Sequence, residues 1–82
     1  MKITVKVIGR YKDMTGKEKI ILDIIDGNTL QDVINAFVKL YPAADKDKSR
    51  MMVTKNKIFT SFDTTVTKED EITFSPPVVS GG

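Results

Sequence analysis

The carboxylate that follows Gly81 and Gly82 at the end of the chain is the group whose chemistry stands out most clearly. Because neither residue has a side chain, the backbone there can enter a channel too narrow for any Cβ atom. A glycine carboxylate is unreactive in water, but a partner protein that uses ATP can convert it into an acyl adenylate. A sulfur or nitrogen nucleophile can then attack that adenylate. The sequence therefore predicts that Gly82 carries the reacting group and that Gly81 is its slender approach.

Side-chain catalysis has little support, because the chain contains neither cysteine nor histidine. Disulfides, thiolate metal sites and cysteine nucleophiles are thereby excluded, and general base work would fall to an Asp, Glu or Lys with a shifted pKa. Asp70 and Glu71 are adjacent, but neighbours in a turn that enters a strand point apart and do not form a catalytic pair. We therefore expect no metal site, no bound cofactor and no catalytic side chain.

Composition limits the remaining classes of protein. A chain of 82 residues has room for one domain, and 40% hydrophobic with 29% charged residues is typical of a soluble globular protein. The net charge is only +2 and the lysines are scattered, which argues against a nucleic-acid partner. No apolar stretch reaches the roughly 18 residues of a membrane span, and the start does not resemble a signal peptide. We expect a cytoplasmic protein with no membrane partner.

The N-terminal half predicts two strands and a helix. Residues 2–8 and 18–25 carry alternating apolar residues, and the segment 9–17 between them reads as the loop of a long hairpin. Thr29 and Asp32 form a capping box at the start of a helix, and Pro42 ends that helix. Apolar residues at spacings of three and four give the helix one apolar stripe: Leu30, Val33, Ile34, Phe37, Val38 and Tyr41.

The C-terminal half predicts three more strands after a surface loop over residues 43–50. A short strand starts at residues 51–53, where at least one of the two methionines belongs to the core. Asn56 and Lys57 read as a tight turn before the strand at 58–59, and the last strand ends at Ser75. This order of elements predicts one sheet wrapped around one helix, so we expect a single domain over residues 1–75 and a tail over 76–82.

The tail and two phenylalanines are the candidate contacts with a partner. Pro76 and Pro77 fix φ and remove two donors, so the chain should leave the sheet in an extended state, with residues 76–80 guiding the glycines into the partner. Phe62 lacks a clear period and is a candidate exposed anchor for docking. Alternation with Ile72 favours a core position for Phe74, although its closeness to the tail also suits an interface.

The last strand and the tail resemble the ubiquitin-like sulfur-carrier family, and within it the small subunits of molybdopterin synthase. The matching residues are the Asp-Glu-Ile-Thr-Phe run at 70–74, the Pro-Pro-Val unit at 76–78 and the final Gly-Gly, with Asn56 in its turn as looser support. The resemblance implies an α+β fold of the β-grasp, ubiquitin-like type, in which a mixed sheet packs on one main helix and a flexible C-terminal tail follows.

The resemblance also implies partners and a reaction. An adenylating enzyme of the ubiquitin-activating type would use ATP to adenylate Gly82, and sulfur would then replace one carboxylate oxygen to give a thiocarboxylate. The carrier would dock on the large subunit of molybdopterin synthase, and residues Pro76, Pro77, Val78, Val79, Ser80 and Gly81 would thread into its active site. There the sulfur would pass to a pterin precursor of the molybdenum cofactor. The chain would thus be a non-catalytic subunit of an enzyme complex, and a monomer when free.

Three alternatives stay open on the sequence alone. Relatives that serve thiamine synthesis or tRNA thiolation keep the Gly-Gly end, and so do archaeal modifiers that are conjugated to proteins through it. The chain could therefore be a carrier for another acceptor or a protein modifier joined through Gly82. The remaining alternative is a plain binding module with a β-grasp fold and an idle tail.

Overall fold

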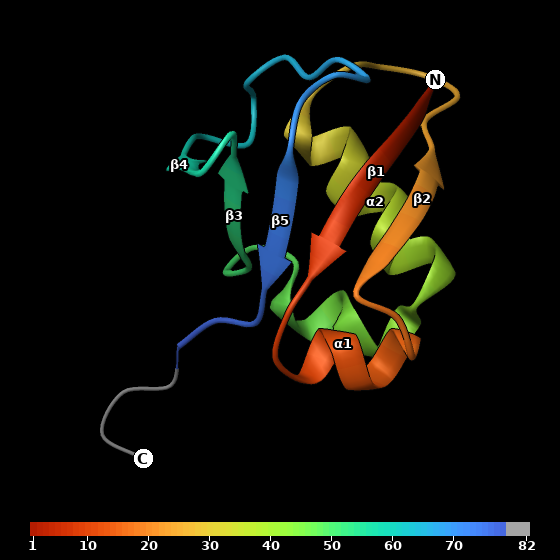
Figure 1. Cartoon of the computed structure of the whole chain (residues 1–82), viewed down its shortest axis with the longest axis vertical. Helices are drawn as coiled ribbons and strands as arrows, with labels where there is room; N and C mark the ends of the chain where they lie inside the picture. The colour runs from red at the N-terminus through yellow and green to blue at the C-terminus, as the bar shows by residue number, and fades with distance from the viewer. Residues whose placement is uncertain (79–82) are drawn as a thin grey trace.

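A computed structural model describes residues 1–78 of the chain, which contain a five-stranded sheet in the order β2-β1-β5-β3-β4 (Figure 1). β1 and β5 run parallel, and the other neighbouring strands are antiparallel. The strands are β1 Lys2–Val7, β2 Lys19–Asp23, β3 Met52–Lys55, β4 Ile58–Phe59 and β5 Ile72–Ser75. The helices are α1 Arg10–Thr15, α2 Leu30–Leu40 and the 3-10 helix η1 Pro42–Asp47.

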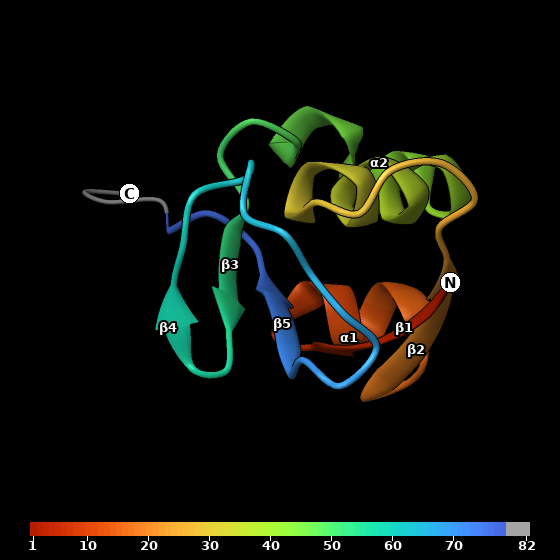
Figure 2. The ribbon, with the colours of Figure 1, turned by 90° about the horizontal axis from the view of Figure 1, so that it is seen from above.

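The helix α2 covers one face of the sheet, which we call the inner face (Figure 2). Side chains of β1 alternate strictly between buried and exposed, as the predicted period of two requires. The buried stripe of α2 packs against them and consists of Leu30, Val33, Ile34, Phe37 and Val38. This mixed sheet on one main helix is the predicted β-grasp arrangement.

Both ends of α2 form where the sequence places them. The Thr29 N–H donates to Asp32 Oδ2 at 2.9 Å, and the Asp32 N–H donates to Thr29 Oγ1 at 3.3 Å, so the predicted capping box is confirmed. These bonds hold the pKa of Asp32 below its usual value, chiefly through the Thr29 N–H. At the other end α2 stops at Leu40, shortly before Pro42.

Two segments predicted to be loops are helical. The predicted hairpin loop 9–17 contains α1, which starts after Gly9 (φ 62°) and ends at Gly16 (φ 72°). The predicted surface loop 43–50 contains part of η1 and buries Ala44 and Asp47. Each helix has six residues, too short to show a period, and is fixed by tertiary contacts of a few buried side chains rather than by a stripe.

Other local predictions are confirmed. Met51 is buried in the core, and Asn56 (φ 54°) and Lys57 (φ 69°) form the tight turn between β3 and β4 with both residues in the left-handed region. The last strand ends at Ser75. Within residues 1–78, no helix has the length and apolar character needed to cross a membrane.

Candidate functional site

The candidate site begins where β5 ends and the tail leaves the sheet. β5 lies between β1 and β3, and its last residue, Ser75, precedes two half-buried prolines, Pro76 and Pro77. Val78 follows with 76% of its surface exposed. The other predicted tail residues, Val79, Ser80, Gly81 and Gly82, lie outside the described residues. The structure therefore shows the root of the tail, which we define as residues 76–78.

Phe74 anchors the strand that carries this root. Its side chain is fully buried, and its ring centroid lies 5.2 Å from that of Phe37 on α2 in an edge-to-face arrangement. Phe37 also contacts the ring of Tyr11 at 5.4 Å. A fully buried ring cannot reach a partner, so the interface role considered for Phe74 is wrong and its core position is confirmed.

Phe62 is not the exposed anchor that the sequence suggested. It is half-buried and packs against the core cluster. The segment around it runs over the start of α2, where the Gln31 N–H donates to the Phe62 carbonyl at 2.8 Å and the Leu30 N–H donates to the Thr64 carbonyl at 3.0 Å. The segment lacks a period because its carbonyl groups accept hydrogen bonds from the free N–H groups of the first helical turn. Whether Phe62 contacts a partner stays a prediction.

Gly9 lets α1 start directly against the root of the tail. A Cβ atom at this position would lie 3.4 Å from Cδ of Pro76, and the positive φ of Gly9 disfavours any other residue. Just before it, the Ile8 N–H donates to the Phe74 carbonyl at 3.2 Å and extends the pairing of β1 with β5. The turn into α1 and the root of the tail are therefore held at the same end of the molecule, as Figure 1 shows.

A buried carboxylate ties α1 to η1 at this end. Asp47 Oδ2 accepts hydrogen bonds from the Tyr11 hydroxyl at 2.8 Å and from Arg10 at 2.9 Å, although Asp47 is only 2% exposed. The Arg10 guanidinium is the main reason that the pKa of Asp47 lies below its usual value, and burial raises the pKa of Tyr11. We call Arg10, Tyr11 and Asp47 the buried triad after its buried carboxylate, although the Arg10 side chain itself is exposed. The sequence does not reveal the triad, because no signal links position 11 to position 47.

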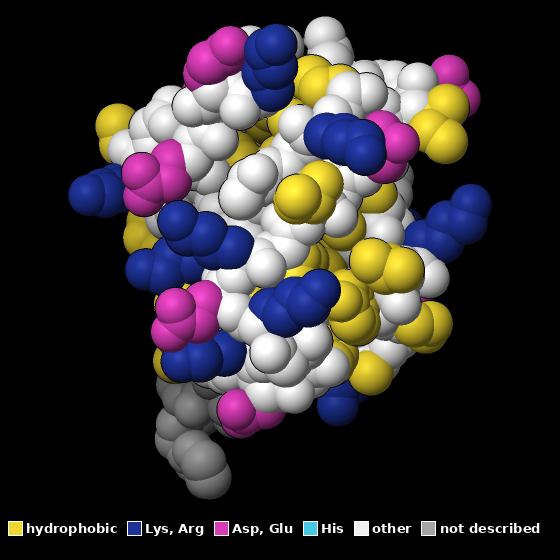
Figure 3. Space-filling view, turned by 45° about the vertical axis from the view of Figure 1, so that its right-hand side comes forward, with side chains coloured by type: hydrophobic (Ala, Val, Ile, Leu, Met, Phe, Trp, Pro, Cys, Tyr) yellow, Lys and Arg dark blue, Asp and Glu magenta, His cyan; other side chains and the backbone are white. Residues whose placement is uncertain are grey.

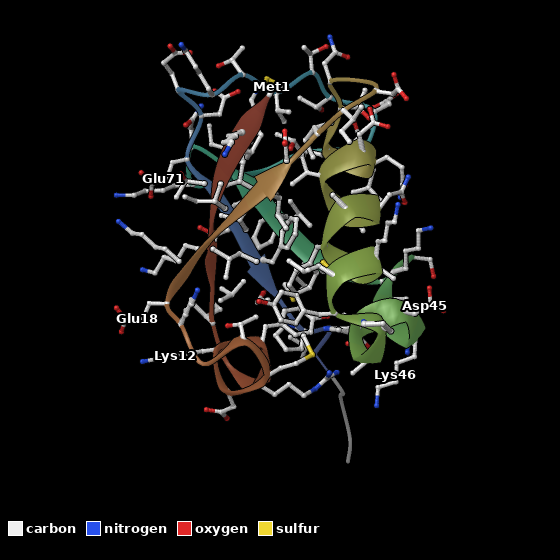
Figure 4. The ribbon with its side chains drawn as sticks, turned by 90° about the vertical axis from the view of Figure 1, so that its right-hand side faces the viewer. Met1, Lys12, Glu18, Asp45, Lys46 and Glu71 are labelled. Carbon is white, nitrogen blue, oxygen red and sulfur yellow. The ribbon has the colours of Figure 1, made fainter. Side chains whose placement is uncertain are left out.

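A second ion pair supports α1 from outside. Lys12 Nζ lies 3.0 Å from Glu18 Oε1, and Figure 4 shows both side chains at the end of the molecule that carries α1. The Lys12 ammonium lowers the pKa of Glu18. Because both side chains are largely exposed, water screens this pair and it adds little to stability.

The outer face of the sheet carries several apolar side chains, and two of them, Ile8 and Met52, lie beside the end of β5 where the tail begins. Val53 and Phe74 are paired in register and point inward, so the next pair, Met52 and Ser75, points outward. By the same alternation, Phe59 shares the outer face with its register partner Thr54 and is 66% exposed. Ile8, beyond the end of β1, is also exposed. We define Ile8, Met52 and Phe59 as the outer-face patch, which the sequence analysis did not identify.

The turn before Phe59 is held by hydrogen bonds to the two residues that precede β5. Asn56 Nδ2 donates to Asp70 Oδ1 at 3.0 Å, and the Glu71 N–H donates to Asn56 Oδ1 at 2.8 Å. Asp70 Oδ2 accepts from the Thr67 N–H at 2.7 Å, which is the main cause of the lowered pKa of Asp70. Asp70 is thus engaged in holding a turn, in agreement with the rejection of an Asp70–Glu71 catalytic pair. Among residues 1–78, no group of acidic side chains is arranged to hold a metal ion.

Comparison with known proteins identifies the family. The model of the ThiS family matches residues 5–82, which is nearly the whole chain and includes the final Gly-Gly. The chain belongs to the ThiS family. The resemblance to ubiquitin-like sulfur carriers inferred from the tail is thereby confirmed.

Individual relatives agree with the ThiS assignment. The chain is 27% identical to the molybdopterin synthase sulfur carrier subunit of Arabidopsis thaliana over 82 residues, which is 100% of this chain and 84% of that protein. Its structure matches SAMP1 of Haloferax volcanii with a TM-score of 0.77 and 24% identity, over 100% of both chains. It also matches a chain in the complex of subunits 1 and 2 of the molybdopterin-converting factor of Helicobacter pylori, with a TM-score of 0.62, 21% identity and coverage of 99% and 100%. These structures confirm the β-grasp fold.

Proposed function

We propose that this chain is the sulfur-carrier subunit of a molybdopterin synthase and that its working group is the carboxylate of Gly82. The observation that carries the proposal is the full-length match to a molybdopterin synthase sulfur carrier subunit, within a family match that extends through Gly82. The structure supports it, because β5 directs the root of the tail away from the core and Val78 is exposed. In this proposal the folded domain positions the tail.

The proposed reaction has two steps at Gly82. A carboxylate oxygen attacks the α-phosphorus of ATP, and pyrophosphate leaves with formation of an acyl adenylate. Hydrosulfide from a sulfur donor then attacks the carbonyl carbon, and AMP leaves with the electron pair of the C–O bond that joined it to that carbon. Loss of the hydrosulfide proton to water gives the thiocarboxylate. A separate adenylating enzyme supplies the catalytic groups, since the acidic residues of the described part that have altered pKa values are engaged in structural contacts.

The proposed partner in sulfur transfer is the large subunit of the synthase. A structural relative of this chain occurs in a complex of two subunits of the molybdopterin-converting factor, which supports a two-subunit assembly. The outer-face patch is a suitable docking surface, because Phe59 is a largely exposed aromatic side chain on the outer face and Met52 of the same patch pairs in register with Ser75, next to the root of the tail. Docking there would place the tail close to the active site of the large subunit.

The test of this function starts from the loaded chain, in which Gly82 already carries a thiocarboxylate. The loaded chain is mixed with the large subunit from the same organism and the cyclic pyranopterin precursor, and the intact mass of the carrier is followed. We expect the carrier to return to its unloaded mass while the precursor gains sulfur, and we expect no change when the large subunit is omitted. A carrier that stays loaded with a competent large subunit, but loses its sulfur to thiamine or tRNA precursors, would contradict the assignment.

A further inference from the structure

The strand β2 forms one edge of the sheet and exposes a regular row of backbone groups. Its pairing with β1 uses even-numbered residues, as shown by the bonds from the Ile24 N–H to the Met1 carbonyl at 2.7 Å and from the Val7 N–H to the Glu18 carbonyl at 2.9 Å. The N–H and C=O groups of the odd-numbered residues, Lys19, Ile21 and Asp23, therefore point away from the sheet. Within the described residues β2 pairs only with β1.

The side chains of these three residues are self-complementary. Ile21 lies in the middle, 64% exposed, with Lys19 on one side and Asp23 on the other, both exposed. In an antiparallel pairing of two copies of β2 centred on Ile21, each isoleucine faces the other isoleucine. Each Lys19 then faces Asp23 of the second copy, and opposite charges in this position are favourable. The same register pairs every outward N–H and C=O group of the three residues, so backbone and side chains select one alignment.

An apolar groove continues the surface beside β2. It has a volume of about 460 Å³ and lies between β2 and the second half of α2, where Leu40 is 59% exposed. Figure 3 shows hydrophobic side chains gathered on this side of the molecule. The two-fold axis of the pairing is perpendicular to the sheet, so both copies of α2 lie on the same side and the two grooves face each other. Dimerisation would thus remove apolar surface from water as well as pair the strands.

We propose that this chain forms a homodimer through β2, in which two sheets join edge to edge into one continuous sheet. The interface is a short strand and a small groove, so the dimer is weak and depends on protein concentration. β4 lies at the opposite edge of the sheet, so the outer-face patch around Phe59 stays accessible in both copies. The proposal departs from the monomer expected from the sequence. It is independent of the proposed sulfur chemistry, because it concerns another edge of the molecule.

The test measures the mass of the full chain by sedimentation equilibrium up to about 1 mM protein, the upper range for a weak but specific complex. We expect the average mass of the wild type to rise from monomer towards dimer. Lys19→Asp places two carboxylates opposite each other at both ends of the pairing, and Asp23→Lys places two ammonium groups there. Each variant is expected to dimerise about tenfold more weakly than the wild type.

A mixture of these two variants tests directly whether position 19 faces position 23 of the second copy. In the mixed dimer every Asp at position 19 or 23 faces a Lys, so the two variants should associate with each other more strongly than either associates with itself. The control Lys68→Asp makes the same change of charge on an exposed residue away from β2 and should dimerise like the wild type. In the wild type, protection of the Ile21 amide from hydrogen exchange should rise with concentration.

Two results would overturn the proposal. One is a wild-type chain that stays monomeric up to about 1 mM, which would leave the β2 edge to another kind of partner or to water. The other is a mixture of Lys19→Asp and Asp23→Lys chains that associates no better than the separate variants, because the dimer would then use a different surface. Neither result would bear on the chemistry at Gly82.

Discussion

Two regions meet where β5 ends, and they differ in what surrounds them. Tyr11, Asp47 and Phe74 are enclosed by the core, and the Asp47 carboxylate is paired with the Tyr11 hydroxyl and with the exposed Arg10. The root of the tail follows Phe74 directly, and the outer-face patch lies on the face of the sheet opposite the core, with Val78 and Phe59 largely exposed. In this domain the buried region holds the chain in place, and the exposed region is left for partners. Stability and sulfur transfer should therefore be separable by mutation.

Removal of Gly81 and Gly82 should have the largest effect on function and the smallest on folding. The truncated chain ends in Ser80, whose side chain stands beside the new carboxylate, so we expect complete loss of adenylation by the activating enzyme. The exchange of labelled pyrophosphate into ATP measures this step. The melting temperature should be unchanged, and Ser80→Ala in the full chain should keep normal exchange. Exchange by the truncated chain at the normal rate would place the reacting group elsewhere.

Phe59→Ala should weaken docking without affecting the fold. Loss of an exposed aromatic anchor at an interface is expected to cost about 2 kcal/mol of binding to the large subunit, or roughly thirtyfold in affinity. Titration calorimetry with the large subunit gives this value, and thermal unfolding checks the fold. Ile25→Ala is the matched control, since Ile25 is also highly exposed but lies outside the outer-face patch. Equal affinities for both variants would remove the patch from the docking surface.

Tyr11→Phe should lower stability without affecting adenylation. The variant keeps the ring against Phe37 but removes the hydroxyl that donates to Asp47, so the free energy of unfolding should fall by about 2 kcal/mol. Urea unfolding measures the change, and pyrophosphate exchange under native conditions should stay at the wild-type level. Tyr41→Phe removes a hydroxyl from a neighbouring ring and should change stability by less than about 0.5 kcal/mol. A loss of adenylation in folded Tyr11→Phe protein would show that the two regions are coupled.

The buried triad should also make stability depend on pH. The pKa of Asp47 is lower in the folded chain, so its contribution is fully present above the unfolded pKa of about 4 and is lost as pH falls through the folded pKa. Asp47→Asn removes this titration, so its stability should decline less steeply below about pH 4 than that of the wild type. Urea unfolding across this range tests the slope, and parallel curves for the two proteins would contradict the assigned ion pair.

Lys57→Gly should have the smallest effect of these variants, a slight increase in the free energy of unfolding. Lys57 holds φ at 69° in the turn that presents Phe59, a conformation that glycine adopts at little cost. We expect an increase of about 0.5 kcal/mol in the free energy of unfolding with unchanged docking. Lys48→Gly is the control, because φ is −50° there and glycine should destabilise the chain. A loss of stability in Lys57→Gly would show that the side chain matters more than the backbone.

The part of the fold that could be predicted is the part in which apolar residues recur with a period. β1 and α2 follow directly from such patterns, and the cap at Thr29 from its spacing to Asp32. α1 could not be predicted, because a six-residue helix fixed chiefly by Tyr11 has no stripe. The burial of Asp47 depends on a contact between positions 11 and 47, which the sequence alone does not indicate.

The candidate site divides in a similar way. The prolines and the final glycines predict a tail from their own backbone properties, so the prediction needs no knowledge of tertiary contacts. The outer-face patch could not be predicted without the order of the strands. Phe59 is exposed because β4 is a short strand at the edge of the sheet. An aromatic residue after a turn looks the same in a sequence whether it lies in the core or outside, whereas Phe62 attracts the prediction of an exposed anchor because it lacks a clear period.

The central claim is tested most directly by the intact mass of the chain after incubation with the activating enzyme of its own organism, ATP and a sulfur donor. The account predicts that one oxygen is replaced by sulfur, that fragmentation places the change at Gly82, and that the chain without Gly81 and Gly82 gains nothing. An unchanged mass, with an activating enzyme that loads another ThiS-family carrier under the same conditions, would contradict it.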